Sequence, residues 1–231
     1  MDEHETTVRL NKFLALHRGV SRREADDLIS HGRVSVNGQH ANLGARVSES
    51  DTITIDGTAV TNDTEYRYVL LNKPVDYVCS RKAQSDTPTI YSLLPPDMKP
   101  LKPVGRLDKD SSGLLLLSND GDFAFRMTHP RFHKLKTYEI TLDKSLEPLH
   151  QQMISEYGVT LEDGVSRLQL ERRDDTHRQD WRVVMHEGRN RQIRRTFAAL
   201  GYTVTRLHRT NFGNYSLGDI PLGSHQIVDM H

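Results

Sequence analysis

The spacing of apolar residues changes near residue 60, and this change constrains the fold more than any other feature of the chain. Early in the sequence, Leu10, Phe13 and Leu14 recur at helical spacing before the pattern breaks at residues 17–20. From residue 66 onward, apolar runs of strand length alternate with turn sequences such as the one at residues 119–121. We therefore expect two domains, at residues 1–62 and 63–231, joined by a polar linker.

The first domain combines helices with short strands. Ser21 and Glu24 have the spacing of a capping box, in which each side chain bonds the backbone N–H of the other residue. The helix that begins there is expected to end at Gly32. Residues 34–38 and 52–57 alternate like strands. The sequence thus predicts a small α/β domain.

The second domain contains more strands than helices. Its strand candidates are residues 66–71, 114–118, 138–142, 168–172, 181–185 and 203–207, and its helix candidates are residues 122–127, 146–157 and 191–200. Strands joined mostly by hairpin-like turns, with few crossover helices, favour an antiparallel or mixed sheet. We expect an α+β fold for the chain.

Composition narrows the functional classes. No apolar run approaches the roughly 18 residues that a membrane span needs, and the acidic N-terminus lacks the apolar core of a secretory signal. The single cysteine, Cys79, excludes an internal disulfide and suits a reducing compartment, where we expect it to fill space in the core. These features predict a cytoplasmic protein without a membrane partner.

The net charge is zero, but the charges are segregated along the chain. Residues 9–23 carry +5, residues 123–138 carry +4 and residues 186–214 carry +5, so the remaining residues carry −14. Basic stretches are often only solvated surface. Segregation on this scale is also what a protein needs to bind phosphates with one face while the rest repels them.

A polar loop between two apolar strands, at residues 104–117, presents the sharpest chemical pattern. If residues 105–108 are extended, Arg106 and Asp108 share one face and Leu107 points to the other. Turn formation and a surface ion pair would explain the same residues. A metal-binding pair of Asp108 and Asp110 is a further alternative, although no additional ligand accompanies it.

Residues 105–113, Gly-Arg-Leu-Asp-Lys-Asp-Ser-Ser-Gly, resemble the Arg-Leu-Asp signature of pseudouridine synthases, particularly the RsuA/RluB/RluF branch. Three other segments agree in order and spacing, at residues 72–74, 136–138 and 187–195. The segments at residues 8–15, 21–26 and 36–38 are similar to the RNA-binding domain first named for ribosomal small-subunit protein four. The resemblance covers nearly the whole chain.

The resemblance implies a role for each matched residue. Asp108 would be the catalytic carboxylate, attacking the ribose or the base or assisting a glycal route. Tyr138 would stack on the flipped uracil or help in proton transfer, and Arg194 would pair with Asp108 and keep it ionised. Arg106 would assist the flip, and Ile193 would form a wall of the uracil pocket. Asp110 is expected on the solvent side of the loop.

The resemblance also implies an RNA partner. Phosphate contacts are expected from Arg9, Lys12, Arg22, Arg23, Lys136, Arg189, Arg191 and Arg195. The expected substrate is a structured stem-loop of ribosomal RNA, with motif details closer to the large-subunit enzymes, and the protein is expected to act as a monomer without metal or cofactor. An RNA-binding protein without catalysis, and a metal-dependent nuclease or phosphatase, are the rival functions. A zinc pair of His129 and His133 is a weaker alternative, because Pro130 interrupts a helix there.

Overall fold

The computed structural model describes residues 7–61, 65–81, 86–174 and 176–230. Backbone contacts divide the chain into two compact units, residues 1–66 and 67–231. The boundary expected between residues 62 and 63 falls outside the described residues. Within the described part of the chain, no helix is long and apolar enough to cross a membrane.

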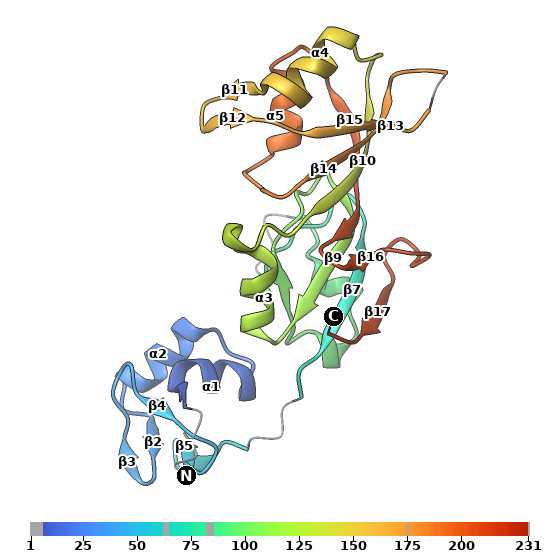
Figure 1. Ribbon diagram of the computed structural model, residues 1–231. Helices are drawn as coiled ribbons and strands as arrows, with labels where there is room; N and C mark the ends of the chain where they lie inside the picture. The colour runs from blue at the N-terminus through green and yellow to red at the C-terminus, as the bar shows by residue number, and fades with distance from the viewer. Residues whose placement is uncertain (1–6, 62–64, 82–85, 175, 231) are drawn as a thin grey trace, which may run out of the picture. The chain divides into compact units, whose positions relative to one another are not determined.

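The first unit packs two helices on short strands (Figure 1). Its elements are β1 (Val8–Arg9), α1 (Leu10–His17), α2 (Arg22–Ser30), β2 (Val34–Val36), β3 (Gln39–His40), β4 (Arg46–Val47), β5 (Ile53–Ile55) and β6 (Thr58–Ala59). The predicted capping box is confirmed: Ser21 Oγ accepts from the N–H of Glu24 at 3.1 Å, and Glu24 Oε2 accepts from the N–H of Ser21 at 2.6 Å. Leu10, Leu14 and Ala25 lie at the centre of this unit's own buried core.

The second unit is built on one nine-stranded sheet in which seven strands follow the order β13-β14-β10-β15-β9-β7-β17. These strands are β7 (Tyr68–Lys73), β9 (Ser112–Ser118), β10 (Lys136–Leu142), β13 (Gln169–Arg172), β14 (Asp180–Met185), β15 (Val204–Phe212) and β17 (His225–Val228). The other two, β8 (Lys102–Val104) and β16 (Tyr215–Ser216), pair with β9 and β15. Only β15 and β9 pair in parallel among the described strands, which confirms the mixed, largely antiparallel sheet.

The leucine run at residues 114–117 forms the middle of this sheet. Leu115 and Leu117 face one buried cluster, and Leu114 and Leu116 face another. A central strand that is buried on both faces needs apolar residues at every position, which explains the unbroken run. One end of β9 is thereby fixed in the core, and the polar loop before it is held at the sheet.

The remaining elements cover the sheet or connect its strands. They are η1 (Ile90–Leu93), η2 (Pro96–Met98), α3 (Gly121–Thr128), η3 (Pro130–Phe132), α4 (Pro148–Gln152), η4 (Met153–Tyr157), β11 (Val159–Leu161), β12 (Gly164–Ser166) and α5 (Gln192–Ala198). Residues 161–164 form the tip of the β11–β12 hairpin, whose strands were not predicted. The helix expected at residues 146–157 is α4 continued by a π-helical turn.

Candidate active site

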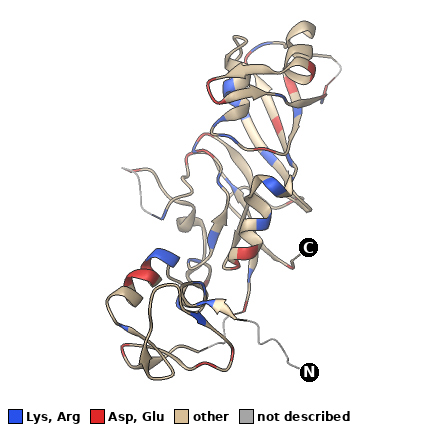
Figure 2. Ribbon diagram, turned by 60° about the vertical axis from the view of Figure 1, so that its left-hand side comes forward, with Lys and Arg blue, Asp and Glu red and all other residues tan. Residues whose placement is uncertain are grey.

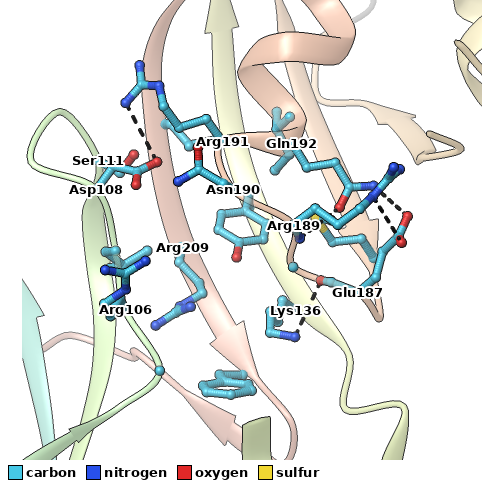
Figure 3. Close-up of a pocket in the computed structure, with 18 of the residues that line it drawn as sticks. Arg106, Asp108, Ser111, Lys136, Glu187, Arg189, Asn190, Arg191, Gln192 and Arg209 are labelled. Atoms are coloured by element: carbon cyan, nitrogen blue, oxygen red, sulfur yellow. Dashed lines mark hydrogen bonds and ion pairs between the residues drawn. The ribbon is translucent and has the colours of Figure 1, made fainter. Parts of the chain in front are cut away.

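A cavity of about 510 Å³ opens over β10 and β15. Residues from three of the four matched segments of the second unit line it, among them Arg106, Asp108, Tyr138, Ile193 and Arg194. Its size lies within the usual range for small-molecule sites. Figure 3 shows its charged and polar lining.

The loop that carries Asp108 is held from below by a buried lysine. Lys73, at the end of β7, is fully buried, and its Nζ donates to the carbonyl oxygens of Pro74 at 2.9 Å, Asp108 at 3.1 Å and Ser111 at 2.7 Å. Burial lowers the pKa of Lys73. Two of the three bonds hold the backbone of the loop, at Asp108 and at Ser111, so the carboxylate is presented from a rigid loop.

Arg106 and Asp108 both line the cavity, and Leu107 between them is buried, as expected. The reason differs from the predicted one. The strand ends at Val104, and Gly105 has a φ of +75°, so simple strand alternation does not apply. The thiol of Cys79 packs below this loop and donates to the carbonyl oxygen of Leu107 at 3.4 Å, and burial raises its pKa.

The expected pairing of Arg194 with Asp108 is wrong in this structure. Arg194 Nε lies 3.2 Å from Asp110 Oδ2, and its guanidinium also donates to the carbonyl oxygens of Asp110 and Val204. The guanidinium nearest Asp108 is that of Arg191, at 3.7 Å (Figure 3). The reason is the turn at residues 108–111, which directs Asp110 toward the start of α5.

Asp110 is therefore an anchor rather than a free surface carboxylate. Arg191 donates two hydrogen bonds to it, at 2.9 and 2.7 Å, and these bonds hold its pKa below the usual value. Arg191 itself has a left-handed φ of +46°, which is costly for a residue with a side chain. Arg191, expected to contact a phosphate, is engaged with Asp110 in this structure.

Tyr138 and Ile193 lie where the sequence places them, in the wall of the cavity. Tyr138 is buried in β10, between Val183 of β14 and Arg209 of β15. Ile193 is buried in the first turn of α5 and packs on the main core. Both side chains come from rigid elements, so the apolar wall of the cavity is preformed.

Arg189 and Arg195, expected to contact phosphates, are engaged within the protein. Arg189 donates to carbonyl oxygens of Asp163, Gly164 and Val165, and Arg195 makes two bonds to the carboxylate of Asp163 at 3.0 and 2.7 Å. Both arginines thus hold the β11–β12 hairpin against the start of α5. That hairpin was not predicted, so its acceptors could not be foreseen.

Comparison with known proteins agrees with this geometry. Residues 67–199 match the family described as RNA pseudouridylate synthase, and residues 8–53 match the S4 domain. The chain is 38% identical to ribosomal small subunit pseudouridine synthase A of Pasteurella multocida, over 92% of this chain and 91% of the relative. It is 36% identical to ribosomal large subunit pseudouridine synthase B of Bacillus subtilis, over 96% and 93%.

A crystal structure of a pseudouridylate synthase is also similar, with 33% identity, a TM-score of 0.68 and 96% coverage of both chains. The chain belongs to the RNA pseudouridylate synthase family. The resemblance of its motifs to pseudouridine synthases, and of its first unit to the S4 domain, is confirmed.

The basic side chains of the S4 domain lie on and beside its two helices. Arg9, Arg22 and Arg23 are exposed, and Lys12 is half-buried. Arg22 donates to Asn11 Oδ1 at 3.1 Å. Arg22 and Arg23 open α2, and acidic residues follow them in the same helix, as the blue and red segments in Figure 2 show.

Two residues of the synthase unit were missed as parts of the site. Lys73 was noted only as part of a motif, although a lysine that ends a wholly buried strand must find acceptors in the interior. Arg209 is 2% exposed and lines the cavity from β15. Its segment was read only as basic, because the inward direction of its side chain depends on the register of a long strand.

The histidines of the weaker metal alternative make local contacts. His129 Nδ1 accepts from the N–H of Arg131 at 3.3 Å, and the His133 ring lies 5.4 Å from that of His186. Among the described residues, no group of three or more histidine, cysteine, aspartate or glutamate side chains is arranged to hold a metal ion.

Proposed function

We propose that this synthase isomerises a uridine of ribosomal RNA to pseudouridine, with Asp108 as the catalytic carboxylate. The convergence of Asp108, Tyr138 and Ile193 on one cavity carries the proposal. These residues come from three separate segments of the chain, and each has a function only if a base enters the space between them. An RNA-binding protein without catalysis would give no role to a carboxylate on a loop that Lys73 holds through its backbone carbonyls.

The reaction breaks the N1–C1′ bond of the uridine, rotates the uracil and forms a bond between C5 and C1′. The proton on C5 leaves, and a proton is restored at N1, so atoms and electrons balance without an added group. A base within a folded RNA is out of reach, so the nucleotide must first be flipped into the cavity. Arg106, exposed at the edge of the cavity, is placed to support the displaced strand.

The proposed roles follow from position. Asp108 supplies the carboxylate that acts on the ribose or the base. Tyr138 offers a ring face for stacking and a hydroxyl for proton transfer, and Ile193 forms the apolar wall against the uracil. Arg194, with Arg191, holds the turn through Asp110 and so positions the carboxylate.

Ribosomal RNA is proposed as the substrate because the similar proteins are named for it. Their names divide between the small subunit, as in Pasteurella multocida and Yersinia pestis, and the large subunit, as in Bacillus subtilis. A large-subunit target remains our prediction from the motif details. Mapping pseudouridines in both rRNAs from cells with and without the gene tests it, and a missing site in small-subunit rRNA would contradict it.

The central experiment replaces Asp108 by asparagine. Asp108→Asn should abolish pseudouridine formation, measured as tritium release from C5-labelled uridine in rRNA transcripts, because the amide cannot act as a nucleophile. The variant should fold and bind RNA, since Lys73 bonds the Asp108 carbonyl and not its side chain. Asp97→Asn, at an exposed surface pair with Arg67, is the matched control and should retain wild-type turnover.

Turnover of Asp108→Asn at the wild-type rate would contradict the assignment. Chelation of divalent metal ions distinguishes the proposed reaction from that of a metal-dependent enzyme. With the RNA folded in monovalent salt, EDTA should leave tritium release unchanged, whereas a metal-dependent nuclease or phosphatase would lose its activity.

A further inference from the structure

Two basic side chains from neighbouring strands meet in one part of the cavity. Lys136 begins β10 and Arg209 lies in β15, and in Figure 3 Arg209 is drawn between Arg106 and Lys136. The ring of Phe212 lies beneath both, with its centroid 5.2 Å from Lys136 Nζ and 4.9 Å from Arg209 Cζ. The pairing of β10 with β15 brings the three residues together.

The backbone around Arg209 is fixed by a close approach of strands. A Cβ on Gly113 would lie only 2.3 Å from the Arg209 carbonyl oxygen, so β9 and β15 touch at this point. Arg209 Nε donates to the Leu114 carbonyl oxygen at 2.8 Å. The guanidinium is held in one orientation, and its buried Nη2 finds no acceptor among the described residues.

Neither cation has a carboxylate partner. Among the described residues, no carboxylate oxygen lies within ion-pair distance of Lys136 or Arg209. The contacts of Lys136 Nζ are two carbonyl oxygens, of His186 and Glu187, each at 3.4 Å. Burial and the nearby charge of Arg209 lower the pKa of Lys136 to about 8. Two like charges held together in a partly buried site cost free energy unless a ligand supplies negative charge.

We propose that Arg209 and Lys136 form a subsite for one phosphodiester group of the RNA strand, beside the flipped nucleotide. The inference rests on the proposed function for the identity of the ligand as RNA. A phosphate satisfies both cations and the rigid N–H groups of the guanidinium, whereas uracil is neutral and offers only carbonyl acceptors. Arg209 is the cross-strand neighbour of Tyr138, which places this phosphate within about one nucleotide of the stacked base.

The first test measures affinity and its salt dependence on unmodified small- and large-subunit rRNA transcripts. Arg209→Gln should weaken binding about ten- to a hundredfold and reduce the log–log salt slope by roughly 0.7 to 0.9. Arg209→Lys keeps the charge and should recover most of the slope. Arg206→Gln is the matched control on the same strand, because this exposed arginine only faces Glu139 at 3.7 Å, and it should behave like wild type.

The second test does not depend on the folding of an Arg209 variant. Methylphosphonate linkages, which carry no charge, are placed one at a time around the target uridine of a fragment that the wild type modifies. One linkage should weaken wild-type binding about tenfold or more, and the same linkage should matter much less to Lys136→Met.

Three outcomes would overturn the subsite. The first is an unchanged salt slope in Arg209→Gln. The second is equal sensitivity of wild type and Lys136→Met to every methylphosphonate linkage. The third is a loss of turnover in Arg209→Gln at wild-type affinity, which would mean that Arg209 contacts the base. Failure of the proposed function looks different: the wild type would release no tritium from either rRNA, while the variants still differed in salt slope.

Discussion

At the scale of single residues, Asp110 controls which charged side chains approach Asp108, the proposed catalytic carboxylate. It holds Arg191 through two hydrogen bonds and Arg194 through an ion pair, while Arg191 stays 3.7 Å from Asp108. If Asp110 were neutral, both guanidinium groups would have Asp108 as their nearest carboxylate. The proposed nucleophile would then be paired with a guanidinium group that must leave before it can react.

Asp110→Asn is therefore expected to lower turnover roughly tenfold or more, with RNA affinity near wild type. It should remain more active than Asp108→Asn, which loses the nucleophile itself. Single-turnover tritium release and equilibrium binding measure the two quantities separately. Wild-type turnover would show that the anchor has no part in catalysis.

Since the pKa of Asp110 is lowered, its contribution to stability is present at neutral pH and is lost as the pH falls through that lowered pKa.

Tyr138→Phe keeps the buried ring and removes only the hydroxyl. If the hydroxyl takes part in proton transfer, turnover should fall by about 10²–10⁴-fold while RNA binding is retained. Tyr157→Phe, at an exposed tyrosine of the same unit, is the matched control. A Tyr138→Phe enzyme as fast as wild type would reduce the residue to stacking and packing.

The sequence predicted which residues of the matched motifs line the cavity. It did not predict which arginine pairs with which carboxylate. The placement of Asp108, Tyr138 and Ile193 in one cavity followed from their motifs. The choice of Asp110 over Asp108 as the partner of Arg194 did not, because it depends on a turn of only a few residues. Several arginines and several carboxylates lie in these segments, and the sequence alone does not determine which of them form ion pairs.

At the scale of elements, the parallel contact between β9 and β15 depends on a glycine. Gly113 has a φ of +103°, and a Cβ there would collide with the Arg209 backbone. Gly113→Ala should destabilise the protein by about 3 kcal/mol, because both the conformation and the clash oppose the side chain. Urea unfolding measures the loss. Gly121→Ala is the control, since its added Cβ meets nothing within 4 Å and the change should be within about 0.5 kcal/mol. Equal stability of the two variants would contradict this account.

Elements with a strong local signal were predictable, and several short strands of the synthase unit were not. The capping box of α2 and the apolar strand β9 have strong local signals, and both are present. The strands β2 and β5 are three residues long and were predicted from their alternation, whereas β8, β11, β12, β16 and β17 are two to four residues long and have no such pattern. The order of strands in the sheet could not be predicted from the sequence either, because strand pairing depends on packing between residues distant in the chain.

At the scale of the whole molecule, each unit has a buried core of its own. Deleting residues 1–66 should leave a folded synthase unit with a cooperative thermal transition. Its affinity for rRNA should fall, and the log–log salt slope should decrease by roughly 0.7 to 0.9 for each phosphate that Arg9, Arg22 and Arg23 neutralise in the full-length protein. An unchanged salt slope in the shortened protein would show that the S4 domain makes no phosphate contacts with the RNA.

The place of β15 in the sheet has a consequence for synthesis on the ribosome. Although β9 and β10 come earlier in the chain, they do not pair with each other, since β15 lies between them. A nascent chain that ends before residue 204 therefore lacks the strand that joins β9, which follows the loop carrying Asp108, to β10, which carries Tyr138. The enzyme should acquire its active site only after residues 204–212 have been translated, so a nascent chain without β15 should not modify the RNA around it.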